Sequence, residues 1–160
     1  MNVSSNDFSS APWEYVTSIE YIPTTEFTFY SIKVDYVSQG DVILDDTTNL
    51  QILVDSGADA FQVPVAAANS LNSYWSPPGT YYNEGQDLNI ECDAVLTQEI
   101  GVAIGGVVYR ISSEDLIYTN EQGNCWSLIQ GTDGTQGFLI GDPLLKNVLA
   151  VFDWGDQVIS

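Results

Sequence analysis

Short stretches of alternating apolar and polar residues run through most of the chain. Residues 27–37 alternate with the two-residue period of a strand, so one face is expected to point toward the core. The apolar face carries Tyr30, Ile32, Val34 and Tyr36. A turn at 38–41 and an apolar run at 42–44 complete a predicted hairpin. Residues 100–111 predict another hairpin, because Gly105-Gly106 lies between two apolar stretches and suits a two-residue turn.

Few stretches have the composition of a helix. Pro64 followed by the alanine-rich residues 65–71 predicts one helix, since proline suits a helix start and alanine suits its interior. A capped helical turn is expected at 112–116 and a short helix at Asp142-Pro143. Further strands are predicted at 81–82, 88–92, 138–140 and 151–153, with a weak strand pattern at 13–22. Many short strands and few helices predict a mainly β domain, and 160 residues suffice for one core.

A carboxylate stands at the end of one apolar strand. Residues 52–54 form a run typical of a strand buried on both faces, and Asp55 follows directly. Ser56 and Gly57 then turn the chain, because glycine tolerates backbone angles that other residues avoid. Since Asp, Ser and Gly are ordinary turn residues, this tripeptide alone indicates no more than an acid on a tight turn.

A second stretch with the same order of features lies near the end of the chain. Residues 138–140 form an apolar strand that meets Gly141, a short helix begins at Asp142, and a further apolar strand ends at Asp153. Together the two stretches resemble one lobe of an aspartic protease, specifically the C-terminal lobe of the pepsin-like enzymes. The resemblance implies a single lobe of the mainly β acid-protease fold, of double-psi β-barrel type, with one or two short helices. It covers residues 27–160 and leaves 1–26 as an N-terminal extension or edge strand.

The resemblance also implies roles for individual residues. In this family the motif Asp-Thr/Ser-Gly carries the catalytic carboxylate, which here is Asp55, and an apolar-apolar-Gly motif packs beside the catalytic loop. Ser56 is implied to orient Asp55 by hydrogen bonding across the interface between lobes. The residues implied to support the loop are Ser56, Gly57, Leu139, Ile140 and Gly141. Ala58 and Asp59 are implied to meet the substrate.

The residues that follow Gly57 resemble a second branch of the same family. Pepsin-like C-terminal lobes usually have Thr or Ser there, whereas this chain has Ala58-Asp59, as retroviral-type aspartic proteases do. Ala58 therefore lacks a hydroxyl that is expected to contact substrate in pepsin-like enzymes. The length, the cysteine pair and the stretch 100–153 favour the pepsin-like lobe.

Aspartic proteases hydrolyse peptide bonds with a water activated by two carboxylates, and this chain has one matching motif. Asp133 lies in a glycine-rich loop and Asp156 lies at the chain end, so neither has the context of a second catalytic acid. We therefore expect half of an aspartic endopeptidase site, inactive as an isolated monomer. The second acid would come from an N-terminal lobe or from a second copy of the chain, and the substrate would be a peptide or protein. The alternative is a catalytically inactive lobe that serves as a binding or interaction module.

Composition restricts the remaining classes of function. The chain has 22 acidic residues, three basic ones and no histidine, which gives a net charge of −19. Such a surface disfavours nucleic acid and anionic membranes as partners, and no apolar stretch is long enough to span a membrane. The absence of histidine excludes Ser-His and Cys-His mechanisms that draw the histidine from this chain. Two cysteines cannot build a tetrahedral thiolate site, so we expect no metal and no cofactor.

Cys92 and Cys125 are the only cysteines, and the residues alone leave them either free and buried or joined. The resemblance implies a disulfide, because the pepsin-like C-terminal lobe carries one at this position. A disulfide indicates an oxidising compartment, so we expect a secreted, extracellular or vacuolar protein. The sequence pI of about 4.1 is compatible with work in acid. The first residues contain no apolar run, so a secreted protein is expected to be represented here by its mature form.

Overall fold

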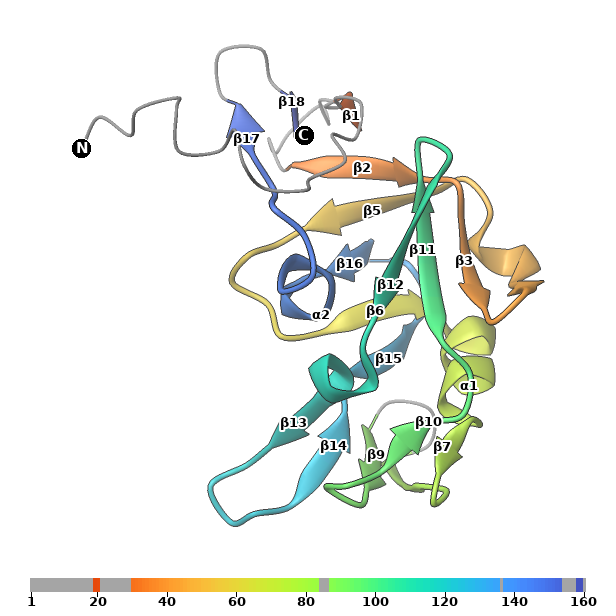
Figure 1. The fold of residues 1–160 in the computed structure, drawn as a ribbon, viewed down its shortest axis with the longest axis vertical. Coiled ribbons are helices and arrows are strands. Elements are labelled where there is room, and N and C mark those ends of the chain that lie inside the picture. Colours follow the sequence, from red (N-terminus) through yellow and green to blue (C-terminus); the bar gives the residue numbers. More distant parts are fainter. Residues whose placement is uncertain (1–18, 21–29, 84–86, 136, 154–157, 160) are drawn as a thin grey trace, which may run out of the picture.

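The computed structural model describes residues 19–20, 30–83, 87–135, 137–153 and 158–159. These residues form a mainly β structure with two short α-helices, which confirms the predicted fold class (Figure 1). The predicted boundary between residues 26 and 27 lies outside the described residues. Within the predicted N-terminal extension, the structure describes one strand, β1 (Ile19–Glu20). It pairs antiparallel with β18 (Val158–Ile159), which pairs in turn with β17 (Phe152–Asp153).

The central element is a five-stranded sheet with the strand order β15-β6-β16-β5-β2. Its strands are β2 (Ser31–Val34), β5 (Leu50–Val54), β6 (Phe61–Pro64), β15 (Ile129–Thr132) and β16 (Phe138–Ile140). The neighbours β15 and β6 are parallel, as are β16 and β5, whereas β6 and β16 are antiparallel. The sheet thus places β16, from near the end of the chain, between the two strands that flank Asp55.

Two four-stranded sheets and one two-stranded sheet pack around this element. One four-stranded sheet has the order β12-β11-β3-β4, formed by β3 (Tyr36–Gln39), β4 (Val42–Ile43), β11 (Ile100–Ile104) and β12 (Val107–Ile111). It contains both predicted hairpins, with Gly105-Gly106 in the turn between β11 and β12. The other four-stranded sheet has the order β13-β14-β9-β8, formed by β8 (Thr80–Asn83), β9 (Asp87–Ile90), β13 (Ile117–Thr119) and β14 (Cys125–Ser127). A two-stranded sheet pairs β7 (Trp75–Ser76) with β10 (Val95–Leu96).

The predicted helices are confirmed, but one predicted cap is not. Helix α1 (Val65–Asn72) begins directly after Pro64, and α2 (Asp142–Leu145) has proline in its first turn. The turns η1 (Asp45–Thr47) and η2 (Ser113–Leu116) are 3₁₀-helical. At η2 the Ser112 side chain makes no capping hydrogen bond. Its carbonyl oxygen instead accepts from the N–H of Asp115 at 3.1 Å, so the backbone closes this short turn without the side chain.

The strand predicted at 27–37 is divided at Asp35, and its first residues lie outside the described ranges. The chain leaves the five-stranded sheet at this point and joins β11 in the neighbouring sheet. The N–H of Asp35 donates to the carbonyl of Ala103 at 2.8 Å, and the carbonyl of Asp35 accepts from the N–H of Asn49. The alternation shifts by one residue across this break, so Val37 is fully buried while Tyr36 is only half-buried. The prediction that Tyr36 continues the apolar face of Ile32 is therefore wrong.

One hydrophobic core connects the sheets and α1. Trp75 lies within it, and its indole N–H donates to Asn72 Oδ1 at 3.1 Å, which satisfies the one polar group of this large side chain. Trp126 is half-buried, and Trp13 and Trp154 lie outside the described residues. Tyr81 and Tyr82 are exposed on β8, an outer strand of its sheet.

The predicted disulfide between Cys92 and Cys125 is confirmed, with the two Cα atoms 5.1 Å apart. It joins Cys92, which lies shortly after β9, to Cys125, the first residue of β14. Strands β14 and β9 are also hydrogen-bonded neighbours in one sheet. The two cysteines are 33 residues apart. A loop of that length gives a stabilisation of roughly 3–4 kcal/mol from restriction of the unfolded chain.

Candidate active site

The candidate catalytic turn, residues 55–60, joins β5 to β6 and passes the end of β16 (Figure 1). Strand β16 runs parallel to β5 with Ile140 beside Val54, and antiparallel to β6 with Ile140 beside Phe61. The turn therefore begins and ends at the same end of these three neighbouring strands. This position follows from the sequence, because the apolar residues of β5 and β6 are buried in the sheet and the polar residues that connect them lie where those strands end.

Three backbone hydrogen bonds fix the turn against the end of β16 and the start of α2. The N–H of Asp55 donates to Ile140 O at 3.1 Å, and the N–H of Gly141 donates to Ala60 O at 3.1 Å. The N–H of Asp142 donates to Ala58 O at 2.8 Å. The two motifs that the sequence places about 85 residues apart are thus joined through their main chains. Ala60 and the Asp142 amide were not predicted as part of this arrangement, although both adjoin predicted residues.

The carboxylate of Asp55 is held by its own turn. Its Oδ1 accepts from the N–H of Gly57 at 2.8 Å, the hydrogen bond of an Asx turn. Asp55 is half-buried, whereas Ser56 and Gly57 are exposed. Within the described residues the Asp55 side chain makes no other hydrogen bond, which leaves Oδ2 open to a further partner. The Ser56 hydroxyl makes none with any part of the described chain.

Gly141 is required by the closeness of the two motifs. A Cβ atom on this residue would lie 2.8 Å from the carbonyl carbon of Ala58 and 3.0 Å from Asp55 O. Both neighbours are backbone atoms fixed by hydrogen bonds, so they cannot turn aside as a flexible side chain would. Glycine therefore stands here because the two main chains approach too closely for a side chain.

The remaining predicted residues have different surroundings. Ile140 is fully buried beneath the turn, while Leu139 points to the other face of the sheet and is half-buried. Ala58 is half-buried and Asp59 is exposed, so Asp59 is the more accessible of the two residues expected to meet substrate. The structure brings all the predicted loop-support residues to the same end of the central strands of the sheet.

Asp133 lies at the far end of the same sheet from Asp55. It follows β15, which is parallel to β6 with Thr132 beside Pro64, whereas the candidate catalytic turn adjoins Phe61 at the other end of β6. Its Oδ1 accepts from the N–H of Thr135 at 3.0 Å and from the Thr135 hydroxyl at 2.8 Å. These bonds, with the backbone one the stronger, lower the pKa of Asp133 because they favour its charged form. Asp133 therefore closes its own loop and is not placed to share a proton with Asp55.

No other described carboxylate hydrogen-bonds to Asp55. Asp156, the other acid considered from the sequence, lies outside the described residues. Across the described ranges no group of three or more Cys, Asp or Glu side chains is arranged to hold a metal ion. No helix in the described ranges is both long and apolar enough to cross a membrane.

An acid-bearing turn that is fixed by an apolar-apolar-Gly strand within a parallel and antiparallel sheet defines a lobe of the aspartic-protease class. A family model described as eukaryotic aspartyl protease matches residues 9–160. The chain belongs to this family, and its resemblance to the pepsin-like enzymes is confirmed.

Curated relatives agree with this assignment. A probable aspartic-type endopeptidase of Aspergillus fumigatus is 32% identical over 157 residues, covering 93% of this chain and 35% of its own length. Chymosin of Callithrix jacchus is 25% identical over 151 residues, covering 93% of this chain and 38% of its own length. Secreted aspartic protease 10 of Candida albicans is 29% identical over 121 residues, covering 74% of this chain and 24% of its own length. The chain thus spans little more than a third of the length of the first two relatives.

Proposed function

We propose that this chain is a C-terminal-type lobe of an aspartic endopeptidase and supplies Asp55 as one of two catalytic carboxylates. The observation that carries the proposal is the Asp55 turn. One carboxylate oxygen is fixed by the Gly57 N–H at 2.8 Å, and the side chain makes no other hydrogen bond among the described residues. A catalytic acid needs both a fixed orientation and an accessible oxygen, and Asp55 has both.

Aspartic proteases are the standard example of two carboxylates that share one proton. In the proposed mechanism the ionised carboxylate takes a proton from a water as that water attacks the peptide carbonyl. The protonated carboxyl polarises the carbonyl oxygen and gives it its proton as the tetrahedral diol forms. When the C–N bond breaks, the proton taken from the water passes to the leaving nitrogen, and a diol hydroxyl returns a proton to the other carboxylate. Asp55 fills either of these two roles, and an acid from outside the described residues fills the other.

The second acid is proposed to come from an N-terminal lobe or from a second copy of this chain. The relatives support the first source, because the matched region is 35% of the length of the fungal endopeptidase. In this proposal residues 27–160 form the lobe and residues 1–26 an N-terminal extension or edge strand, in keeping with the pairing of β1 with β18. Ser56, exposed and without a hydrogen bond in the described part of the chain, is proposed to bond across the interface and orient Asp55. Ala58 and Asp59 are proposed to meet a peptide or protein substrate.

The proposed setting is extracellular or vacuolar. The Cys92–Cys125 disulfide supports an oxidising compartment, and one relative carries the description secreted aspartic protease. The net charge of −19 supports an acidic working range, because protonation of carboxyls reduces the repulsion within the folded chain.

The test is proteolysis after separation by size. Fractions of the purified chain from gel filtration are assayed with denatured casein at about pH 3.5 and about pH 7, which bracket carboxyl titration. We expect the monomer fraction to cleave nothing, and any cleavage to occur in acid in a fraction that holds two lobes. Acid cleavage by the monomer would overturn the half-site. A folded sample that cleaves nothing when paired with a second lobe would favour an inactive binding module, which the absence of a hydroxyl at Ala58 already suggests as the alternative.

A further inference from the structure

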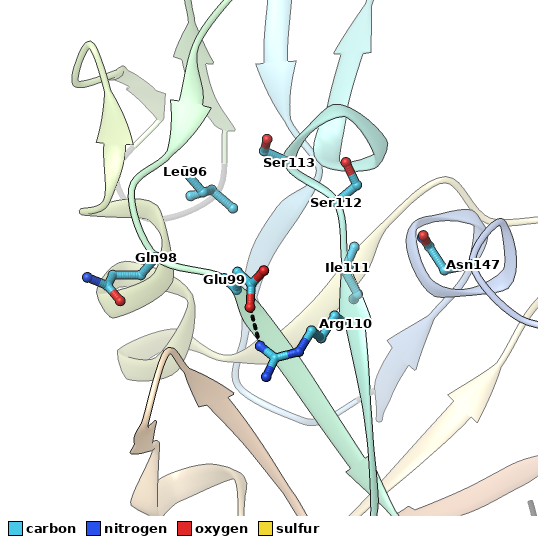
Figure 2. Close-up of a pocket in the computed structure, with 8 residues that line it drawn as sticks. All are labelled: Leu96, Gln98, Glu99, Arg110, Ile111, Ser112, Ser113 and Asn147. Atoms are coloured by element: carbon cyan, nitrogen blue, oxygen red, sulfur yellow. Dashed lines mark hydrogen bonds and ion pairs between the residues drawn. The ribbon is translucent and has the colours of Figure 1, made fainter. Parts of the chain in front are cut away.

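A polar pocket lies at the base of the β11–β12 hairpin (Figure 2). Its volume is about 410 Å³, within the range typical of small-molecule sites. The walls come from β10 and the segment before β11, from the end of β12 and the two residues after it, and from Asn147, which follows α2. None of the lining residues belongs to residues 55–60 or to β16.

Several polar groups of the pocket are available to a ligand. The side chains of Gln98, Ser112 and Ser113 make no hydrogen bond within the described residues. Asn147 donates from Nδ2 to Asp115 Oδ2 at 2.9 Å and to Pro143 O at 3.0 Å, which uses both amide hydrogens and leaves its Oδ1 as an acceptor. The pocket therefore offers two hydroxyls, a free amide and an amide oxygen that is held in place.

The charged groups of the pocket cancel one another. Arg110, the only arginine of the chain, forms an ion pair with Glu99, and Figure 2 shows the pair on one wall. The two side chains are 63% and 67% exposed, so the pair contributes little to stability and remains accessible. The net charge of −19 disfavours an anionic ligand, and Glu99, the one carboxylate among the lining residues, is already paired with Arg110, so the lining offers no unpaired carboxylate to a cation. This combination favours a neutral ligand that both donates and accepts hydrogen bonds.

We propose that the pocket binds a neutral polyhydroxyl ligand, the chemistry of a sugar residue. Each sugar hydroxyl is both a donor and an acceptor, which suits the Ser112 and Ser113 hydroxyls and the fork of Arg110 beside the Glu99 carboxylate. The two apolar lining residues, Leu96 and Ile111, provide contact for the C–H groups of the ring. The site would be independent of proteolysis, since it shares no residue with the candidate catalytic turn.

The test is an NMR titration of the ¹⁵N-labelled 160-residue chain with maltotriose and with cellotriose, with glucose 6-phosphate as the anionic comparison. We expect shifts confined to the lining residues, a dissociation constant of about 1 mM, and weaker binding of the phosphate. Arg110→Gln, and separately Ser112→Ala with Ser113→Ala, are expected to weaken binding by about 10-fold or more. Lys33→Gln removes the same charge from an exposed position outside the pocket and is expected to change nothing.

The same titration can also give results that overturn the proposal. A lack of shifts with both neutral sugars up to about 50 mM, far above the expected dissociation constant, would overturn the proposal. So would shifts that both variants leave unchanged, or tighter binding of glucose 6-phosphate. The dispersion of each variant's spectrum reports its folding, and either variant alone suffices. Co-sedimentation with starch granules and with cellulose then separates a polymer surface from a soluble oligosaccharide as the source of the ligand.

Discussion

Replacing Asp55 by asparagine is expected to lower kcat of the proposed two-lobed enzyme by about 10³-fold or more, the range for removal of a positioned acid or base. Asparagine has the same shape as aspartate, and its Oδ1 can still accept from the N–H of Gly57. It cannot take a proton from water or share one with a second carboxylate. The loss should therefore appear in kcat while the free energy of unfolding changes little. Acid proteolysis of a denatured protein, measured with urea unfolding of the same sample, checks both.

The matched control is Asp133→Asn, which makes the same chemical change at the other end of the sheet. It weakens the hydrogen bonds from Thr135 within its own loop but leaves the candidate catalytic turn intact. We expect activity within about twofold of the unchanged enzyme, as for an exposed surface substitution. If Asp133→Asn abolished cleavage while Asp55→Asn preserved it, the assignment of Asp55 would be wrong.

Replacing Gly141 by alanine is expected to lower the free energy of unfolding by about 3 kcal/mol or more, at the upper end of the cost of overpacking. The added methyl would lie 2.8 Å from the Ala58 carbonyl carbon and 3.0 Å from Asp55 O. Relief would require the turn to move away from β16. That movement would break the hydrogen bonds from Gly141 and Asp142 to the turn. Urea denaturation gives the stability, and the amide shifts of Ala58 and Asp142 report whether the turn has moved.

Gly123→Ala is the control for Gly141→Ala, because it introduces backbone strain without a close contact. Gly123 has a positive φ of 79°, but a Cβ there would meet nothing within 4 Å. Its substitution is expected to cost about 1 kcal/mol, from the left-handed backbone alone. Equal losses from the two alanine variants would contradict the close approach of the two motifs at Gly141.

The turn that carries Asp55 was predictable from local signals, whereas the roles of the candidate site residues were implied by the resemblance to aspartic proteases. Asp55 follows an apolar run and precedes Gly57, and Gly141 follows another apolar run. The residue types indicate an acid on a tight turn, but they do not show that Gly141 lies against the backbone of that turn. The disulfide followed from the resemblance, and Cys92 and Cys125 are indeed joined.

The arrangement that brings these residues together was less predictable. The pairing of β16 between β5 and β6 joins strands that are far apart in the chain, with Leu139 beside Leu53 on one side and beside Gln62 on the other. Alternation shows which side chains share a face but not which strand lies alongside. For the same reason the sequence did not reveal that the chain changes sheets at Asp35, where the partner is Ala103. The hydrogen bond from the Asp142 N–H to the Ala58 carbonyl is likewise a backbone contact, which the pattern of side chains does not predict.

The most direct measurement of the half-site is the stoichiometry of an active-site inhibitor. A peptide with a hydroxyl-bearing tetrahedral carbon in place of the cleaved carbonyl mimics the reaction's intermediate and requires both carboxylates. Calorimetric titration at about pH 3.5, where carboxyl groups are partly protonated, counts its sites on the monomeric chain and on the two-lobed assembly. We predict no binding to the monomer and one inhibitor for each pair of lobes. One inhibitor bound to each monomer would show that a single chain holds both acids, and would contradict the half-site.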